Sequence, residues 1–216
     1  MNKIYLAILI SFTFLSANAQ TKAVTETGQE VILFDNGTWK YEKDSSKKGS
    51  LVLDSLVTNT QEFHKTNEAT FLVKSKVLNV GVFINPAKWT FSAHRDNEVN
   101  PEYRFGSKSG DGFAMMITEK TQINLENMRQ IALLNAQKAA IDAAVTSAEY
   151  RMVNDKKVLC LEIKGTIQGI KFVYLGYYFS NENGTIQLVS YTNQKLYTES
   201  RKELESLING FVEIVK

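Results

Sequence analysis

Cysteine, proline and histidine are scarce in this chain. Its 216 residues include one cysteine, two prolines and two histidines. A single cysteine excludes an internal disulfide framework and a cysteine-based zinc site. His64 and His94 have no second ligand at the spacing of a metal-binding motif, so we predict no metal site and no cofactor. The formal net charge of +2 gives no sign of a polyanionic partner, and we predict no nucleic-acid binding.

Long apolar runs are confined to the N-terminus. Lys3 precedes an apolar stretch over residues 4–15, and Ala17 and Ala19 have the spacing of a cleavage site. We therefore predict a signal peptide over 1–19 and an exported protein, periplasmic or secreted; the alternative is an uncleaved anchor helix. No later segment has about 20 consecutive apolar residues, so we predict no transmembrane segment after cleavage.

Residues 20–42 have the pattern of a small β-meander. Turn signals at 27–29 and 35–37 separate short β-branched and aromatic segments. Asn36-Gly37 is a strong hairpin signal because both residue types tolerate positive φ. A meander of this size is unstable alone, so we expect it to lean on the main domain or on a partner. Residues 43–50 are all polar and predict a linker, and residues 51–216 form the main domain.

Hydrophobic periodicity in the main domain predicts strands and two helices. Asn124 has the position of an N-cap, and apolar residues then recur at helical spacing from Leu125 to Ala139. A second helix is predicted over 199–209, with Gly210 as its stop. The pattern predicts an α+β fold with helices packed on a mostly antiparallel sheet of about six strands. Strands are predicted over 70–77, 80–84, 102–105, 113–118, 148–153, 158–166, 169–179 and 185–192, with a short closing strand over 211–215.

Three stretches of the main domain resemble one known group of domains. "VFINPAKWTF" (82–91) resembles the opening strand and P-x-x-W turn of PsbP-like and Mog1-like domains, which include the bacterial DcrB family. The segments over 158–192 and 200–214 resemble its consecutive hairpins and its closing helix, although Asn209 and Gly210 stand where serine is usual. The resemblance covers about 70–216 and implies an α/β/α sandwich. We expect Trp89, at the end of the turn, to be buried and structural.

The N-terminal stretch "GQEVILFDNGTWKYE" (28–42) separately resembles a short β-motif appended to many bacterial secreted proteins. Neither resemblance implies a universal set of catalytic residues, and shared fold does not give function. The stretch "GSKSG" (106–110) is not a catalytic serine motif, because Lys108 stands where a nucleophile elbow has serine. Cys160 is a nucleophile or a small buried residue, and the second is commoner. We predict no catalytic residues and a protein that is not an enzyme.

The strand over 169–179 carries the functional hypothesis. Its side chains alternate between two faces, and both faces are apolar, so both must be covered. We expect the two helices to cover most of one face and to leave aromatic side chains exposed on the other. Such a strip marks an interaction site, unless the meander covers it fully. The candidate protein-binding residues are Tyr174 and Tyr178 on one face or Tyr177 and Phe179 on the other, and the expected partner is an apolar segment of another envelope protein.

These features predict an exported bacterial envelope protein that acts as a binding, chaperone or assembly module. One alternative is a hydrolase or other enzyme whose site is assembled from scattered residues. A cleft holding a strongly shifted carboxylate or histidine would favour the enzyme. The other alternative is a scaffold that supports the N-terminal β-motif, which deletion of 20–50 would test.

Overall fold

The structure, a computed structural model, describes residues 21–24, 30–33, 39–41, 56–93 and 101–214. The predicted signal peptide and linker lie outside these ranges. The chain forms two compact units, one from Met1–Thr25 and Gln29–Ser45 and the other from Glu26–Gly28 and Ser46–Lys216. Within the described ranges, no helix is long and apolar enough to cross a membrane.

The N-terminal unit holds a three-stranded antiparallel sheet in the order β1-β2-β3. The strands are β1 (Thr21–Val24), β2 (Glu30–Leu33) and β3 (Trp39–Tyr41). The predicted turn signals at 27–29 and 35–37 lie outside the described residues.

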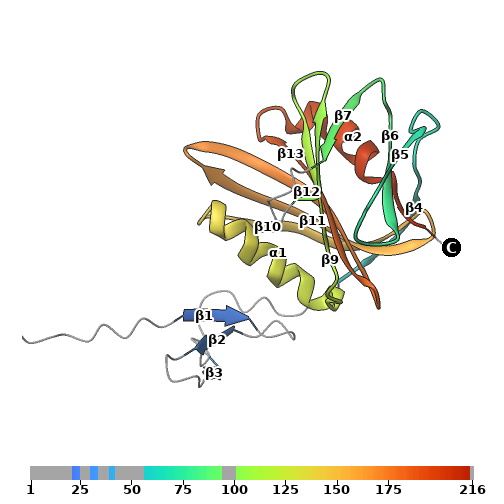
Figure 1. Ribbon diagram of the computed structural model, residues 1–216. Coiled ribbons are helices and arrows are strands. Elements are labelled where there is room, and N and C mark those ends of the chain that lie inside the picture. Colours follow the sequence, from blue (N-terminus) through green and yellow to red (C-terminus); the bar gives the residue numbers. More distant parts are fainter. Residues whose placement is uncertain (1–20, 25–29, 34–38, 42–55, 94–100, 215–216) are drawn as a thin grey trace, which may run out of the picture. The chain divides into compact units, whose positions relative to one another are not determined.

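The main domain is built on an eight-stranded sheet in the order β4-β10-β11-β12-β13-β9-β8-β7 (Figure 1). All neighbours are antiparallel except β4, which pairs in parallel with β10. The predicted count of about six strands is too low, because both edge strands were missed. The strands are β4 (Thr58–Phe63), β7 (Trp89–Ala93), β8 (Tyr103–Ser107), β9 (Phe113–Glu119), β10 (Ala144–Val153), β11 (Lys156–Ile167), β12 (Ile170–Asn181) and β13 (Gly184–Asn193).

A smaller three-stranded sheet has the order β14-β6-β5. It consists of β5 (Phe71–Lys74), β6 (Val80–Ile84) and β14 (Phe211–Glu213). Gly210 starts the connection into β14, and its carbonyl accepts a hydrogen bond from Phe83 N at 2.8 Å. A Cβ at Gly210 would lie 2.0 Å from Phe83 O, so only glycine allows this close approach.

The two helices lie on opposite faces of the large sheet. α1 (Leu125–Ala139) packs on β10, β11 and β12, whereas α2 (Tyr197–Ile208) packs on β12, β13 and β6. The expectation that both helices share one face is therefore wrong. Alternation along β12 explains the arrangement: Tyr178 packs in the cluster that contains Met128 of α1, and Tyr177 in the cluster that contains Leu204 of α2. The main domain thus has helix on both sides of its sheet.

The larger core lies between the sheet and α2. Trp89 is 3% exposed there, and a Cβ at Gly112 would lie 3.3 Å from its ring and 3.0 Å from Leu204. The turn before Trp89 is held by Asn85, whose carbonyl accepts from Trp89 N at 2.9 Å and whose side chain accepts from Ala87 N at 2.8 Å. The prediction that Trp89 is buried is confirmed.

Candidate protein-binding site

The four predicted contact residues on β12 differ in their exposure. Tyr177 and Tyr178 are 1% and 3% exposed, so neither offers surface to a partner. Phe179 is half-buried, with its ring centroid 5.2 Å from that of Phe211. Tyr174 is also half-buried and keeps part of its ring accessible. Burial therefore corrects the prediction for Tyr177 and Tyr178 and leaves Tyr174 as the best placed of the four.

Tyr177 and Tyr178 are structural because each has a helix above it. The Tyr177 hydroxyl donates to Asn209 Oδ1 at 2.7 Å and accepts from Arg151 Nη1 at 3.1 Å, on the α2 side. Tyr178 lies on the α1 side, in a cluster with the fully buried Met128. The sequence shows that both faces of β12 are covered, and the structure shows that a helix covers each.

An aromatic strip lies on the α1 face beside the helix. We define it as Phe172 and Tyr174 of β12, Tyr191 of β13 and Phe113 of β9. Ring centroids are 6.4 Å apart for Phe172 and Tyr174, 5.5 Å for Tyr174 and Tyr191, and 5.7 Å for Tyr191 and Phe113. Phe113 is 45% exposed and the other three are half-buried. The strip thus crosses three neighbouring strands as a continuous, partly exposed aromatic surface.

Cross-strand register brings the strip together. Tyr174 is paired with Tyr191, and Tyr191 with Phe113, so the three side chains point to the same face. α1 packs over β10, β11 and β12, which leaves the β9 end of the strip beside the helix and not beneath it. Three of its members, Phe172, Tyr191 and Phe113, were not among the predicted contact residues. The hairpin signal Asn183-Gly184 would place Tyr174 opposite Asn193, whereas the observed turn at 182–183 places it opposite Tyr191.

The strip is electrically neutral with one cation at its edge. Burial raises the pKa of Tyr174, and Tyr191 adds to the effect. Burial also raises the pKa of Tyr191, although Arg104 acts in the opposite direction. Both phenols therefore stay protonated at neutral pH and can donate hydrogen bonds. Arg104 is exposed on β8 and pairs with Met115 of β9, on the same face as Phe113. The surface suits an apolar segment with polar or acidic groups at its border.

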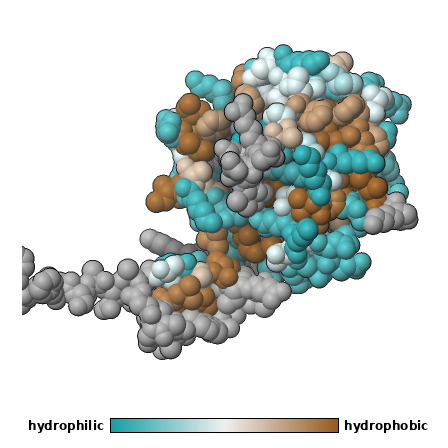
Figure 2. Space-filling view, in the orientation of Figure 1, coloured by the Kyte–Doolittle hydropathy of each residue, from teal (hydrophilic) through white to brown (hydrophobic). Residues whose placement is uncertain are grey.

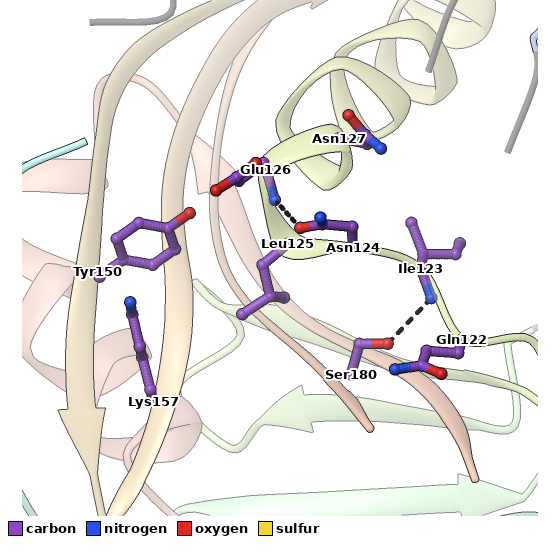
Figure 3. A pocket seen from close by; sticks show the side chains of 9 residues that line it. All are labelled: Gln122, Ile123, Asn124, Leu125, Glu126, Asn127, Tyr150, Lys157 and Ser180. Carbon is purple, nitrogen blue, oxygen red and sulfur yellow. Dashed lines mark hydrogen bonds between the residues drawn. The ribbon is translucent and has the colours of Figure 1, made fainter. Parts of the chain in front are cut away.

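An open cavity of about 590 Å³ lies at the start of α1 (Figure 3). Its wall on one side is Tyr150 and Lys157, with Lys157 Nζ 4.1 Å from the Tyr150 ring centroid. On the other side, Asn124 Oδ1 caps the helix by accepting from Glu126 N at 2.9 Å, and Ile123 N donates to Ser180 Oγ at 3.0 Å. Asn124 Oδ1 and Ser180 Oγ are therefore engaged in contacts that hold the start of α1 in place.

The groups with strongly shifted pKa values lie elsewhere, in the core. Cys160 is 4% exposed, and burial raises the pKa of its thiol to about 12. A thiol that stays protonated is a poor nucleophile, which favours the interpretation of Cys160 as a small buried residue. His64 is exposed, with Nε2 3.4 Å from Glu62, and His94 lies outside the described residues. Among the described residues, no group of three His, Cys, Asp or Glu could hold a metal ion.

Two buried polar clusters stabilise the α2 side of the sheet. Arg151, 7% exposed, pairs with Glu149 and with Glu205 of α2, and its guanidinium lies 4.3 Å from the Phe63 ring centroid. Glu162, 8% exposed, accepts from the Tyr197 hydroxyl at 2.7 Å and from Thr146 Oγ1 at 2.8 Å. Because each group is satisfied within the fold, we assign both clusters to stability.

The chain matches no protein-family model and no curated protein sequence. Among solved structures it is similar to PsbP (CyanoP) from Synechocystis sp. PCC 6803, with 10% identity, a TM-score of 0.51, and coverage of 66% of this chain and 91% of that one. LpqN of Mycobacterium tuberculosis, described as involved in cell envelope biogenesis, follows at 10% identity and a TM-score of 0.44, covering 64% and 86%. PA94 of Pseudomonas aeruginosa, a protein of unknown function, has 8% identity and a TM-score of 0.38, covering 62% and 89%.

These likenesses bear on the fold alone. The overlap with CyanoP supports a PsbP-like fold over two-thirds of the chain. LpqN and PA94 overlap too loosely to carry an argument. The resemblances to Mog1-like domains, to the DcrB family and to the N-terminal β-motif stay predictions.

Proposed function

We propose that this chain is an exported protein of the bacterial cell envelope and that its main domain is a non-enzymatic binding module. The aromatic strip is the binding surface, and an apolar segment of another envelope protein is the partner. The observation that carries this proposal is the partly exposed run of Tyr174, Tyr191 and Phe113 on the α1 face. Aromatic rings give large contact areas at low entropic cost, and they are enriched at protein interfaces.

A binding module fits the described residues better than an enzyme does. The alternative of an enzyme requires a cleft with a strongly shifted carboxylate or histidine. The cavity at the start of α1 contains Glu126, whereas Glu162, a carboxylate with a lowered pKa, lies on the α2 side of the sheet and is buried against Tyr197. Cys160 and Glu162 are thus held in the core, Glu162 by structural partners.

The test uses two double variants of matched chemistry. In Phe113→Ser/Tyr174→Ser the strip loses two rings; in Phe71→Ser/Phe91→Ser a second exposed aromatic pair is lost. Phe71 and Phe91 are 47% and 42% exposed, with ring centroids 5.5 Å apart, at the edge strands β5 and β7. Each purified protein is immobilised and incubated with an envelope extract of its own cell, and retained proteins are identified.

The strip variant should lose a partner that the wild type and the edge variant retain, by about tenfold or more for two interface aromatics. Melting curves of both variants check that the fold is intact. Equal retention by all three proteins, with an intact fold, would contradict the proposal. Loss of the partner on deletion of 20–50 alone, with the strip variant unaffected, would favour the scaffold alternative.

A further inference from the structure

Two loops meet at one end of the main domain. The loop after α1 (140–143) lies against the end of the β11–β12 hairpin, where Thr166 N donates to Asp142 Oδ1 at 2.7 Å. Gly165 allows the contact, since a Cβ there would lie 2.9 Å from the Ala140 side chain. Figure 1 shows the hairpin extending to the left, with its turn close to the C-terminal end of α1. We call this region the tip, and define it as residues 138–143, 164–171 and 194–195.

The tip exposes aliphatic side chains that the fold does not use. Ile141 is 93% exposed and Ile170 is 54% exposed, while Ile167, the cross-strand partner of Ile170, is half-buried. Hydrophobic side chains also project on the left of the main domain in the space-filling view, which has the orientation of Figure 1 (Figure 2). The isoleucines sit on convex loops held in place by the Thr166–Asp142 hydrogen bond. They are therefore presented to a partner, although they do not line a groove.

Positive charge surrounds these isoleucines. The tip contains four lysines, Lys138, Lys164, Lys171 and Lys195, and one acid, Asp142, for a net charge of +3. Lys164 forms an ion pair with Glu162 at 3.1 Å. Lys138, Lys171 and Lys195 are exposed, and Lys195 follows Gln194, whose amide donates to Lys171 O at 2.8 Å. Asp142 is exposed and its pKa is lowered by hydrogen bonds from Thr166 and by Lys171, so it stays ionised, but three exposed lysines outnumber it and the tip is basic on balance.

We propose that the tip binds the surface of an anionic lipid membrane, with Ile141 and Ile170 inserted at the headgroup boundary and the lysines among the headgroups. Convex isoleucines need no preformed pocket in a fluid lipid phase, and they remove apolar area from water there. Lysines near the surface gain from the negative potential of anionic lipids. The membrane site is separate from the aromatic strip, and neither proposal requires the other.

The experiment measures binding of the protein, recovered from expressing cells after export, to vesicles. The vesicles are phosphatidylglycerol with phosphatidylcholine in equal parts, or phosphatidylcholine alone. Three variants are compared with the wild type: Ile141→Ser/Ile170→Ser, Lys138→Gln/Lys171→Gln/Lys195→Gln, and Val57→Ser. Val57 is a matched control, because it is aliphatic, 73% exposed and lies at the start of β4 outside the tip.

The wild type should bind the anionic vesicles preferentially, and added salt should weaken its binding. The isoleucine and lysine variants should each lose roughly tenfold or more in vesicle partitioning, while Val57→Ser keeps wild-type binding. All variants carry the same N-terminus, so a difference between them reports on the tip. The proposal is overturned if the wild type binds neither kind of vesicle. It is also overturned if the isoleucine variant binds the anionic vesicles as well as Val57→Ser does.

Discussion

The two faces of the central sheet are covered to different extents. On one face, α2 and the small sheet bury Trp89, Tyr177 and Leu204, and the polar groups there are satisfied by hydrogen bonds and ion pairs. On the other face, α1 covers β10 to β12, and aromatic side chains beyond it remain partly exposed. Because one face already supplies a large core, the other can leave apolar area uncovered. The first face accounts for stability, and the second carries the surface that we propose for binding.

The largest expected effect comes from the core of the α2 face. Trp89→Ala should cost roughly 3–5 kcal/mol and lower the melting temperature by roughly 6–20 °C, because the buried ring leaves a cavity. Phe91→Ala is the control, since Phe91 lies on the same strand but is 42% exposed. It should shift the thermal transition by only a few degrees. If both variants melted alike, Trp89 would not be part of the main core.

The Arg151 cluster should rank close behind. Arg151→Met removes a guanidinium that pairs with Glu149 and Glu205, and it should cost about 3 kcal/mol because two carboxylates lose their partner. Arg201 offers a comparison, since it approaches the same Glu205 at 3.8 Å but is 48% exposed. Arg201→Met should cost about 0.5 kcal/mol or less. Denaturant unfolding of the two variants separates these outcomes, and equal losses would show that burial does not matter here.

The Glu162 cluster should make stability depend on pH. Burial raises the pKa of Glu162, but hydrogen bonds from Tyr197, Thr146 and Lys164 outweigh it, and the pKa lies below its ordinary value. The stabilisation is therefore present above the ordinary glutamate pKa, about 4.3, and is lost as pH falls through the lower folded value. Glu162→Gln should cost about 1–3 kcal/mol at pH 7.

The same change should flatten the acid limb of the stability curve. Wild type and Glu162→Gln can be compared by urea unfolding between pH 3 and pH 7, where their free energies of unfolding should converge as the pH falls. Parallel curves over that range would show that Glu162 is not the group responsible. Glu213, whose pKa is lowered by its bond to Lys156, contributes with the same sign in both proteins.

A small stability effect is expected from the exposed aromatic ring on the α1 face. Phe113→Ser removes a ring that is 45% exposed, and it should cost about 1 kcal/mol or less. A cost as large as that of Trp89→Ala would mean that the strip belongs to the core and is not free for a partner. Thermal unfolding of the single variant decides this before any binding experiment.

Local patterns in the sequence predict much of this fold. Signals between neighbouring residues predict three of its features: the limits of β6, the N-cap at Asn124 and the helix stop at Gly210. β4 was missed because its sequence TNTQEF is largely polar, and an edge strand with one neighbour needs little apolar surface. β7 is also an edge strand, and only Trp89 of its five residues is buried, so its sequence resembles the end of a turn. Edge strands carry a weak periodic signal.

The candidate site depended on contacts between distant residues. Alternation along β12 indicates that both faces are covered, but it does not say which helix covers which face. The hairpin signal Asn183-Gly184 places Tyr191 on the same face as Tyr174 but misses its register by two residues, and Phe113 joins them through pairing of β13 with β9, distant in sequence. For the same reason, Tyr177 and Tyr178 were equal candidates with Tyr174 until the positions of α1 and α2 were known.

Site-specific photo-crosslinking in cells tests the central claim most directly. A benzoylphenylalanine side chain is introduced at Phe113, on the aromatic strip, and separately at Phe91 on the edge strand β7, which is 42% exposed against 45% for Phe113. The account predicts a discrete protein adduct at position 113 that is weak or missing at position 91. No adduct at 113, or the same adduct at both positions, would contradict it.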